Sequence, residues 1–439
     1  MGDTLVKNIN RLGVEGWLFL TFIVLTIFEG ALRKWFGLPL PLFMAIRDLL
    51  AIVCIARVIF SRRYEEMPIF FKLLLYWTVL VVITSLLQVI INQTPLIIVF
   101  IGWRFWLLYL WFALAVASSL SAAEVRLIVK VLMLITICLV PLSVIQYSLP
   151  SSHIINTLPE TDISQIFILS GEKVRVTGPF TFTLGFTCFV AMILPFSLSG
   201  HLQGRPIIEG KYWALIMLSS ALILSFVSGS RAGLIWAGIL YVLFVFLELI
   251  VNRSKEATRR LFFMIFFGAF FTVIILIWFS DSVAAYTERF QSASEVENFA
   301  DRILIIFLGE PHVLSSFSII GSGFGLGSNA ARIFIDTGVT DFLLAESEPG
   351  RNLLEGGVLG GVWLLSKIVF GLYWTLWSVM FLRRTGDILP FLISITCFYA
   401  FSTWTVTGQL SAHALAYILL TFFIFLVHQS NFKIKLSVS

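Results

Sequence analysis

The apolar stretch Ile69-Phe-Phe-Lys-Leu-Leu-Leu-Tyr-Trp-Thr-Val-Leu-Val-Val-Ile-Thr-Ser-Leu-Leu-Gln-Val-Ile-Ile91 decides the class of fold. It is long enough to cross the hydrocarbon core of a bilayer as one helix, which takes about 20 residues. Similar runs recur along the 439-residue chain, which is 59% hydrophobic and only 13% charged. Strands of a membrane barrel would instead alternate over about 10 residues. The sequence therefore predicts an all-α, polytopic membrane helical bundle that forms one domain over residues 1–439.

Hydropathy predicts about 12 transmembrane helices in this chain. They are expected at residues 14–32, 38–60, 69–91, 95–118, 125–148, 179–199, 211–229, 232–251, 261–280, 353–380, 388–405 and 409–428. Lys and Arg collect in alternate loops, as at Arg62, Arg63, Arg383 and Arg384, so the positive-inside bias predicts that both termini are cytoplasmic. This topology accounts for most of the net charge of +5, and we therefore predict no nucleic-acid partner.

Two long connections, residues 149–178 and 281–352, are predicted to lie on the opposite, outer side. Long loops in a compact domain are usually functional. The second contains an amphipathic stretch at 286–308 that is expected to form an interfacial helix on the membrane surface. It then reaches Gly321-Ser-Gly-Phe-Gly-Leu-Gly-Ser-Asn329. No strand precedes these glycines, so a nucleotide loop is excluded; they either follow a substrate closely or separate two interfacial helices.

Two arginines stand where outer loops meet predicted spans. Arg175 lies just before the span at 179–199, and Arg231 lies in the tight turn Ser228-Gly-Ser-Arg-Ala232. A guanidinium in either place can bind two oxygens of an anion at once. An interfacial anchor at Arg175 and an ordinary turn residue at Arg231 are the structural alternatives.

Charge is densest at the start of the span at 353–380, in Glu346-Ser-Glu348-Pro-Gly-Arg351-Asn-Leu-Leu-Glu355. Charged groups at the mouth of a membrane helix are costly unless they are paired or used. They are therefore candidates for chemistry. The structural alternative is an ion network at a helix start, in which Glu348 pairs with Arg351 and Glu355 lies one turn later.

Other charges lie within apolar runs. Arg47, Asp48 and Arg104 should face the bundle interior, where we expect structural ion pairs of Arg47 or Arg104 with Asp48 or Glu29. The five histidines show no metal-ligand spacing, so the sequence predicts no catalytic metal.

Three motifs occur in a distinctive order: Arg175-x-x-Gly178, then Ser228-Gly-Ser-Arg-Ala232, then a long outer loop that ends in Gly-x-Gly-x-Gly and Glu355-x-Gly-x-x-Gly360. Over roughly residues 170–365 this order resembles the O-antigen polymerase and O-antigen ligase superfamily. The resemblance implies a glycosyltransferase-C-like fold in the inner (plasma) membrane of a bacterium. It also implies an active site on the outer, periplasmic face.

By resemblance, the reaction is a metal-independent, inverting glycosyl transfer that uses no cofactor. A polyprenyl-pyrophosphate-linked glycan would be the donor, a hydroxyl of a second glycan or of a lipid the acceptor, and membrane lipids and other polysaccharide assembly proteins the partners. Arg175, Arg231 and Arg351 would bind the pyrophosphate, because guanidinium groups are always charged and bind phosphate bidentately. Arg302 in the second outer loop is a further candidate for that role.

The sequence departs from the ligase pattern at one position. Ligases of this superfamily usually carry a His nine residues before the Glu of Glu-x-Gly-x-x-Gly, and counting back nine from Glu355 gives Glu346. Glu346 or Glu348 would then be the catalytic base. This favours a polysaccharide polymerase. The alternatives are ligase-like transfer to a lipid or protein acceptor, and a lipid-linked glycan transporter that uses Arg47, Asp48 and Arg104.

Overall fold

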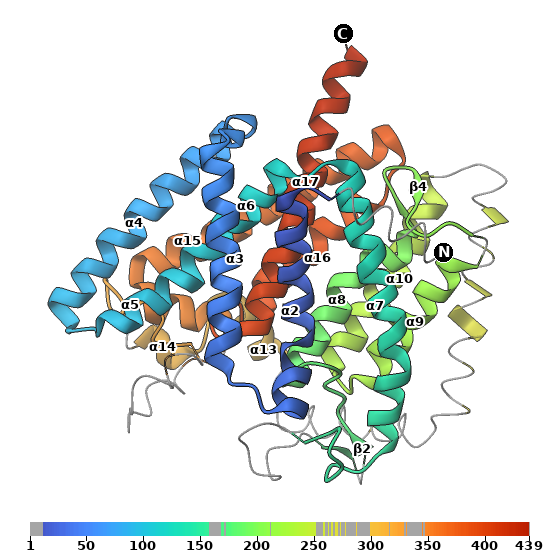
Figure 1. The fold of residues 1–439 in the computed structure, drawn as a ribbon, viewed down its shortest axis with the longest axis horizontal. Helices are drawn as coiled ribbons and strands as arrows, with labels where there is room; N and C mark the ends of the chain where they lie inside the picture. The colour runs from blue at the N-terminus through green and yellow to red at the C-terminus, as the bar shows by residue number, and fades with distance from the viewer. Residues whose placement is uncertain are drawn as a thin grey trace.

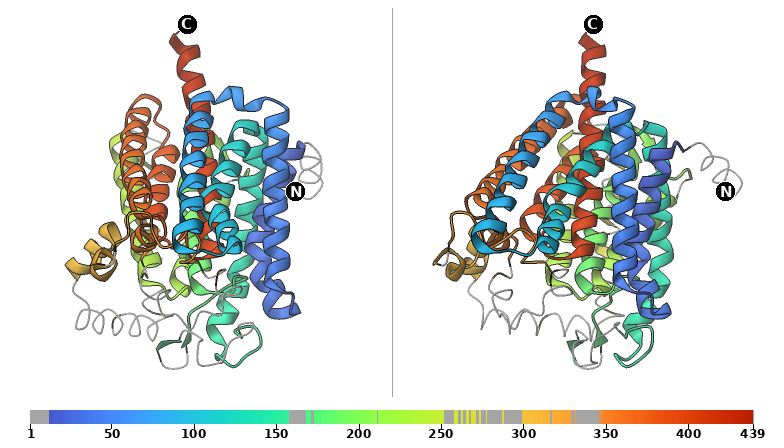
Figure 2. Two further views of the ribbon diagram at one scale, coloured as in Figure 1. Left: turned by 90° about the vertical axis from the view of Figure 1, so that its left-hand side faces the viewer. Right: turned by 60° about the vertical axis from the view of Figure 1, so that its left-hand side comes forward.

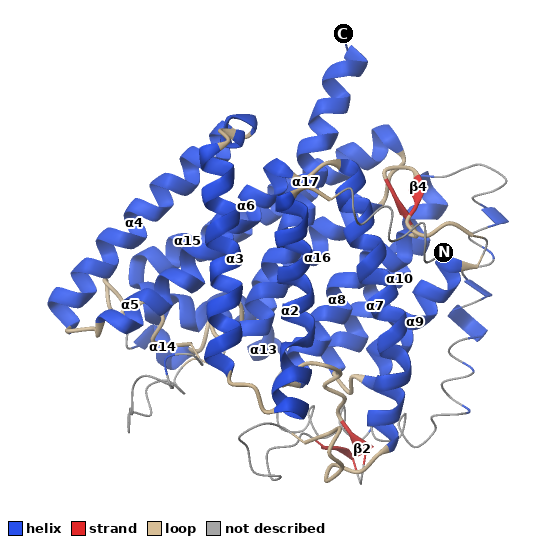
Figure 3. Ribbon diagram, in the orientation of Figure 1, coloured by secondary structure: helices blue, strands red, loops and turns tan. Residues whose placement is uncertain are grey.

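The computed structural model describes residues 12–157, 168–170, 173–210, 212–251, 299–315, 317–328, 331, 345 and 347–438, with isolated positions between 258 and 287. These parts of the chain are almost wholly helical (Figure 3). The only strands there form two short antiparallel hairpins, in which β1 (Ile168–Ser170) pairs with β2 (Lys173–Val174) and β3 (His201–Leu202) with β4 (Arg205–Pro206).

The helices follow the hydropathy pattern. Their bounds are α2 (Val14–Phe36), α3 (Leu40–Phe60), η1 (Arg63–Glu66), α4 (Pro68–Asn92), α5 (Leu96–Trp103), η2 (Arg104–Leu108), α6 (Tyr109–Ser119), α7 (Ala122–Ser148), α8 (Thr183–Ser199), α9 (Trp213–Val227), α10 (Arg231–Val251), α13 (Phe299–Leu308), α14 (Pro311–Ser315), α15 (Glu348–Thr385), α16 (Leu389–Thr403) and α17 (Leu410–Val438). Every predicted span except 261–280, most of which lies outside the described residues, coincides with helix. The expected interfacial helix is described only as α13, because the residues before it lie outside the described ranges.

Within the described ranges, seven helical segments are long and apolar enough to cross a membrane: α2, α4, the continuous α5–η2–α6 segment, α7, α10, α15 and the first part of α17. Three further apolar helices are shorter, with 17 residues in α8 and 15 in each of α9 and α16. At 1.5 Å per residue they are about 22–26 Å long, less than the roughly 30 Å of a bilayer core. The chain is thus a helical protein with several membrane-compatible helices; the number of about 12 spans and the glycosyltransferase-C-like fold stay predictions.

The core of the bundle surrounds α17, which packs against α2, α6, α8 and α16 (Figure 1). Aromatic rings fill it: Phe422 of α17 contacts Phe19 and Phe196 edge to face, with centroids 5.7 and 5.3 Å apart. α4 follows α3 through η1 and then diverges from it (Figures 1 and 2). We call the end of the bundle where α2 ends and α3 begins the loop end; β2 lies there as well.

α15 consists of two helices joined by a sharp bend. Gly357 has φ +53° and ψ −126°, which are not helical values. A Cβ added to Gly360 would collide with the carbonyl of Asn352. In a straight helix these two residues, eight apart, would be separated by about 12 Å. The first part of α15, up to Gly356, therefore folds back beside the part that follows Gly357.

A break in an apolar helix frees backbone groups that need new partners. Residues 319–323 supply them: Ser322 N donates to Leu354 O at 2.8 Å, and Val358 N donates to Ile319 O at 2.9 Å. A Cβ on Gly357 would strike the carbonyls of residues 318 and 319. The segment that leads into the glycine-rich loop (residues 321–328) therefore packs directly on the bend in α15. Only glycine fits at position 357, because its φ and ψ are unfavourable for other residues and because a side chain would collide with this segment.

The fold-back gives a test with a neighbouring control. Gly360→Ala should lower the apparent midpoint of thermal unfolding in detergent, because its methyl group strikes backbone; overpacking of this kind costs about 1–3 kcal/mol. Gly361→Ala is the control, since its Cβ would meet only Leu353 Cδ2 at 3.6 Å, an ordinary contact. Equal midpoints for the two variants would contradict the fold-back.

Candidate functional site

The glycine-rich loop at residues 321–328 encloses the carboxylate of Glu355. Gly325 N donates to Oε2 at 3.0 Å and Gly327 N to Oε1 at 2.8 Å, and Trp106 Nε1 adds a bond to Oε2 at 2.8 Å. The Glu355 side chain is fully buried. A carboxylate with three donors satisfies the requirement that a buried charge be hydrogen-bonded. The loop resembles an anion-binding loop, but the anion that it holds belongs to the protein.

The loop is also fixed from α4 and α5. Gln88 of α4 is fully buried; its Nε2 donates to Ile320 O at 2.7 Å and to Glu355 O at 2.8 Å, and its Oε1 accepts from Phe324 N at 2.9 Å. A Cβ on Gly102 of α5 would collide with the Phe324 backbone. One amide side chain and one glycine of the membrane helices thus determine where the loop lies.

Trp106 reaches Glu355 from η2, the π-helix at Arg104–Leu108. A π-helix inserted in a longer helix redirects the side chains around it and often marks a functional position. Here it turns Trp106 toward the loop and Arg104 toward α3. Arg104 Nε donates to both oxygens of Asp48, at 2.9 and 2.8 Å, and the Tyr109 hydroxyl bonds Asp48 at 2.9 Å.

Glu348 lies at the start of α15 and is 3% exposed. Lys367 Nζ bonds its Oε1 at 3.0 Å, and the backbone N and side-chain Oγ1 of Thr407 each donate to its Oε2 at 2.9 Å. Its ion pair is therefore with Lys367 from the second part of α15. The pairing with Arg351, which the structural alternative expected, is not formed. Glu348 connects both parts of α15 to the loop between α16 and α17.

Arg351 joins the other loops around the same helix start. Its Nε donates to Ala345 O at 2.9 Å and its Nη1 to Gly327 O at 2.8 Å. A Cβ on Gly408 would collide with its guanidinium, so the α16–α17 loop passes directly over it. Because Gly327 N donates to Glu355 while Gly327 O accepts from Arg351, the backbone of a single residue connects the two charged side chains.

A third buried carboxylate, that of Glu310, bonds the residue that caps α15. Glu310, just before α14, accepts from Ser347 N at 2.6 Å and from Ser347 Oγ at 2.8 Å. Ser347 is the N-cap of α15, and its Oγ accepts from Gly350 N at 3.1 Å. Negative charge at a helix N-terminus is favourable. Glu310 therefore fixes the position at which α15 begins.

Arg231 is the first residue of α10, immediately after a tight turn. Gly229 has φ +65°, and Ser230 Oγ accepts from Gly233 N at 3.2 Å as a helix cap does. A Cβ on Gly233 would meet Thr187 Cγ2 at 2.8 Å, so α10 starts directly against α8. The predicted turn between the spans is confirmed.

Arg175 follows β2 in the segment that leads into α8. Lys34 at the end of α2 fixes this segment by donating to Thr177 Oγ1 at 2.9 Å and to Gly178 O at 2.8 Å. Gly178 N in turn donates to Gln146 Oε1 at 2.9 Å. Side chains from α2 and α7 thus anchor residues 177 and 178, just after Arg175, at the loop end of the bundle.

Direct contacts connect the three segments that carry Arg175, Arg231 and Arg351. The first turn of α8 packs against the first turn of α17, since a Cβ on Gly185 would meet Ser411 Oγ at 2.9 Å. α10 also starts against α8, and the residues just before α17 pass over Arg351. The starts of α8, α10, α15 and α17 therefore meet in one region, which we call the arginine region.

Two of the predicted site residues cannot be placed by their side chains. Glu346 lies outside the described residues. Arg302 belongs to α13, which packs against α15 and α16, but its side chain also lies outside the described part. Their predicted roles as base and as pyrophosphate ligand stay predictions.

Searches of protein-family models, curated proteins and solved structures return no significant match. Within the described residues there is also no group of three His, Cys, Asp or Glu side chains that could hold a metal ion. The function must therefore be argued from the site itself.

The charges inside the bundle form the expected ion pairs. Arg47 Nη2 lies 2.8 Å from Glu29 Oε2, and Arg104 Nε lies 2.8 Å from Asp48 Oδ2. Arg47 is fully buried and the Arg104 side chain is 6% exposed. Each buried guanidinium thus lies beside a carboxylate, as a structural ion pair requires, although Arg47 Nε and Nη1 and Arg104 Nη1 have no hydrogen-bond partner among the described residues.

Sequence reasoning missed several residues of the site. Three of them lie inside apolar runs: Gln88, Trp106 and Lys367. A single polar or aromatic residue in such a run does not indicate which residue it contacts. The sequence offered one indication, because an unpaired amide or ammonium group in a membrane helix costs free energy. That cost predicts that Gln88 and Lys367 have partners, but it does not say which.

Replacing Glu355 by Gln should loosen the glycine-rich loop. The amide presents an N–H group where the carboxylate accepts from a backbone N–H, and an unsatisfied buried donor costs about 1–3 kcal/mol. We expect a lower apparent thermal midpoint and faster proteolysis within residues 321–328 in detergent. Glu65→Gln, at an exposed position of η1, is the control. Unchanged proteolysis of E355Q would contradict the role given to this carboxylate.

Proposed function

We propose that the protein is a membrane glycosyltransferase that polymerises polyprenyl-pyrophosphate-linked oligosaccharide repeat units into a surface polysaccharide. The observation that carries the proposal is the arginine region, where segments bearing Arg175, Arg231 and Arg351 meet although they are far apart in the sequence. Guanidinium groups that point from these segments into the region would suit a pyrophosphate, which they can bind bidentately. In a bacterial plasma membrane, the loop end would then face outward.

The reaction requires one displacement. An acceptor hydroxyl oxygen forms a bond to the anomeric carbon of the donor sugar, the bond from that carbon to pyrophosphate breaks, and the polyprenyl pyrophosphate leaves with the electron pair. The hydroxyl proton passes to a carboxylate base. Arginines at the pyrophosphate stabilise the charge that develops on the leaving group, an electrostatic task comparable to that of an oxyanion hole. Attack opposite the leaving group inverts the anomeric centre.

Glu346 is the better candidate for the base. Glu348 is buried, and its two oxygens already accept from Lys367 and Thr407, so it has little capacity left for an acceptor hydroxyl. Its contacts instead suit a positioning residue that fixes the start of α15. Glu346 stands two residues earlier, at the position where ligases of the resembled superfamily carry a His.

The polymerase is preferred to a transporter for a structural reason. A transport path along Arg47, Asp48 and Arg104 would need groups that exchange partners during the cycle. These side chains are already engaged with Glu29, with each other and with Tyr109. The supporting features therefore favour chemistry in the arginine region over movement through the middle of the bundle.

Turnover by purified protein tests the arginines. We expect the wild type, in lipid with a polyprenyl-pyrophosphate oligosaccharide and a chelator, to produce a ladder of polymers. Arg231→Ala and Arg351→Ala should each slow chain growth about 10²–10³-fold, the effect of losing one charge-stabilising donor. Arg62→Ala, an exposed arginine beyond α3, is the control. A single transfer product would favour a ligase, and full activity in both variants would refute the site.

The turnover assay and the thermal midpoint together should distinguish the roles of Glu346 and Glu348. Glu346→Gln should reduce kcat by about 10²–10⁴-fold, the usual contribution of a general base, with little change in the thermal midpoint. Glu348→Gln should lower the midpoint, because it weakens a buried ion pair with Lys367. Full activity of E346Q would exclude it as the base, and an unchanged midpoint of E348Q would contradict the positioning role.

A further inference from the structure

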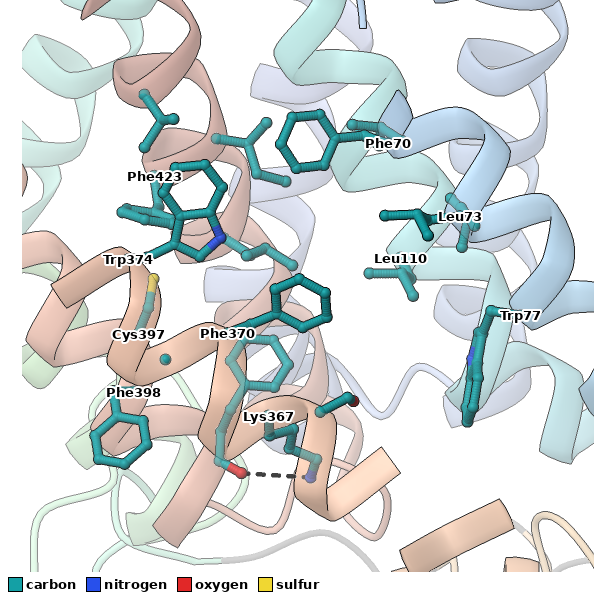
Figure 4. A pocket seen from close by; sticks show the side chains of 18 of the residues that line it. Phe70, Leu73, Trp77, Leu110, Lys367, Phe370, Trp374, Cys397, Phe398 and Phe423 are labelled. Atoms are coloured by element: carbon teal, nitrogen blue, oxygen red, sulfur yellow. Dashed lines mark hydrogen bonds between the residues drawn. The ribbon is translucent and has the colours of Figure 1, made fainter. Parts of the chain in front are cut away.

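An apolar cavity of about 380 Å³ lies beside α4, which diverges here from the bundle (Figure 4). Leu73 and Trp77 of α4 and Leu110 of α6 line one side. Phe370 and Trp374 of α15 line the opposite side, and α16 and α17 close the back. We call this space the α4 cavity.

The lining of the α4 cavity is suited to hydrocarbon. Lys367 is the one Lys or Arg in the lining, and its ammonium donates to Phe401 O at 3.3 Å (Figure 4). It also donates to Glu348 Oε1 at 3.0 Å. Its charge is therefore neutralised at the cavity wall. A ligand gains from this space mainly by burying apolar surface.

The dimensions of the cavity suit a chain rather than a compact molecule. It extends along α4 from Met67 to Trp77, ten residues and about 15 Å at the helical rise. That is half of the roughly 30 Å hydrocarbon core. Because the walls belong to membrane-compatible helices, α4 and α15 among them, an apolar chain lying in the bilayer is the available occupant.

The end of the α4 cavity at Trp77 is lined by side chains that contact the candidate site. The Trp77 ring stacks on Trp363, with centroids 5.1 Å apart, and lies 6.2 Å from Trp106, which donates to Glu355. Lys367 at the same wall is paired with Glu348. A chain in the cavity would therefore contact the side chains whose other faces support the glycine-rich loop and the start of α15.

We propose that the α4 cavity holds part of the isoprenoid tail of the lipid-linked donor. This rests on the proposed function, because the cavity wall contacts the start of α15 through Lys367 and Glu348, and the proposed head-group site is at that helix start. A groove of about 690 Å³ between α3 and the α5–η2–α6 segment is the competing location. Asp48 lies in its wall with its side chain 23% exposed, so a hydrocarbon chain there would desolvate its charge. The Lys367–Glu348 pair at the α4 cavity is already buried, with side chains 8% and 1% exposed.

Photo-crosslinking tests the location without requiring catalysis. The full chain in phospholipid nanodiscs is irradiated with a polyprenyl phosphate that carries a diazirine halfway along its tail, and labelled peptides are identified by mass spectrometry. Label is expected on α4 and α15 at the cavity, displaced by unlabelled polyprenyl phosphate but not by the same excess of phospholipid. Label spread over the lipid-facing surface, label in the groove beside α3, or equal displacement by phospholipid would overturn the proposal.

A pair of substitutions on α4 provides the matched control. Leu73 and Leu75 are 50% and 53% exposed, but only Leu73 lines the α4 cavity. Leu73→Trp should reduce specific labelling about tenfold. This is the loss of affinity expected if the larger side chain keeps about two methylene groups of the tail from being buried in the cavity. Leu75→Trp should leave it unchanged. Equal labelling of the two variants would overturn the assignment.

The same samples distinguish this proposal from the proposed function. Specific labelling of the cavity without glycan transfer would refute the glycosyltransferase and leave a polyprenyl-binding cavity. Glycan transfer without cavity labelling would keep the enzyme and refute this tail site. With both present, Leu73→Trp should raise KM for a long-chain donor more than for a short-chain donor, with kcat little changed.

Discussion

The bonds received by one buried carboxylate hold the candidate site together. Glu355 accepts from a tryptophan of η2 and from two backbone groups of the glycine-rich loop. Without these donors a charge at this depth would cost several kcal/mol. The same loop supplies partners to the backbone freed at Gly357 and accepts from Arg351. The bend in α15, the position of the loop and the direction of the Arg351 side chain therefore depend on one another.

This dependence explains why the site can lie among apolar helices. Irregular backbone is tolerated at membrane depth only where protein or water satisfies its polar groups. Here Gln88 and the loop itself satisfy them, while Glu348 and Lys367 neutralise each other. The structural charges are thus paired between α2 and α3, between α3 and η2, and within α15. The starts of α8, α10, α15 and α17 meet in the arginine region, which brings together the segments that carry Arg175, Arg231 and Arg351.

The helices were predictable from the sequence, whereas the contacts between them were not. Unbroken apolar runs predicted helix at every described span, because each run must bury its backbone hydrogen bonds internally. The pairs of Arg47 and Arg104 were also predictable from the cost of unpaired charge. The bend at Gly357 was not, since glycines in such a helix also permit close packing of neighbours. The structural alternative paired Glu348 with Arg351, but Glu348 pairs with Lys367, because the fold-back brings residues 19 apart together.

The enclosed carboxylate also limits how this region of the sequence can change. A side chain at Gly327 would meet the Glu355 carboxylate. Loss of that carboxylate would leave the backbone N–H groups of Gly325 and Gly327 buried without a hydrogen-bond acceptor. Neither partner can therefore be replaced alone without a cost, so the two are expected to change together or not at all. Glu355 acts as a ligand that the chain supplies to itself, covalently attached and always present, and related sequences should keep the acid and the glycines as a linked set.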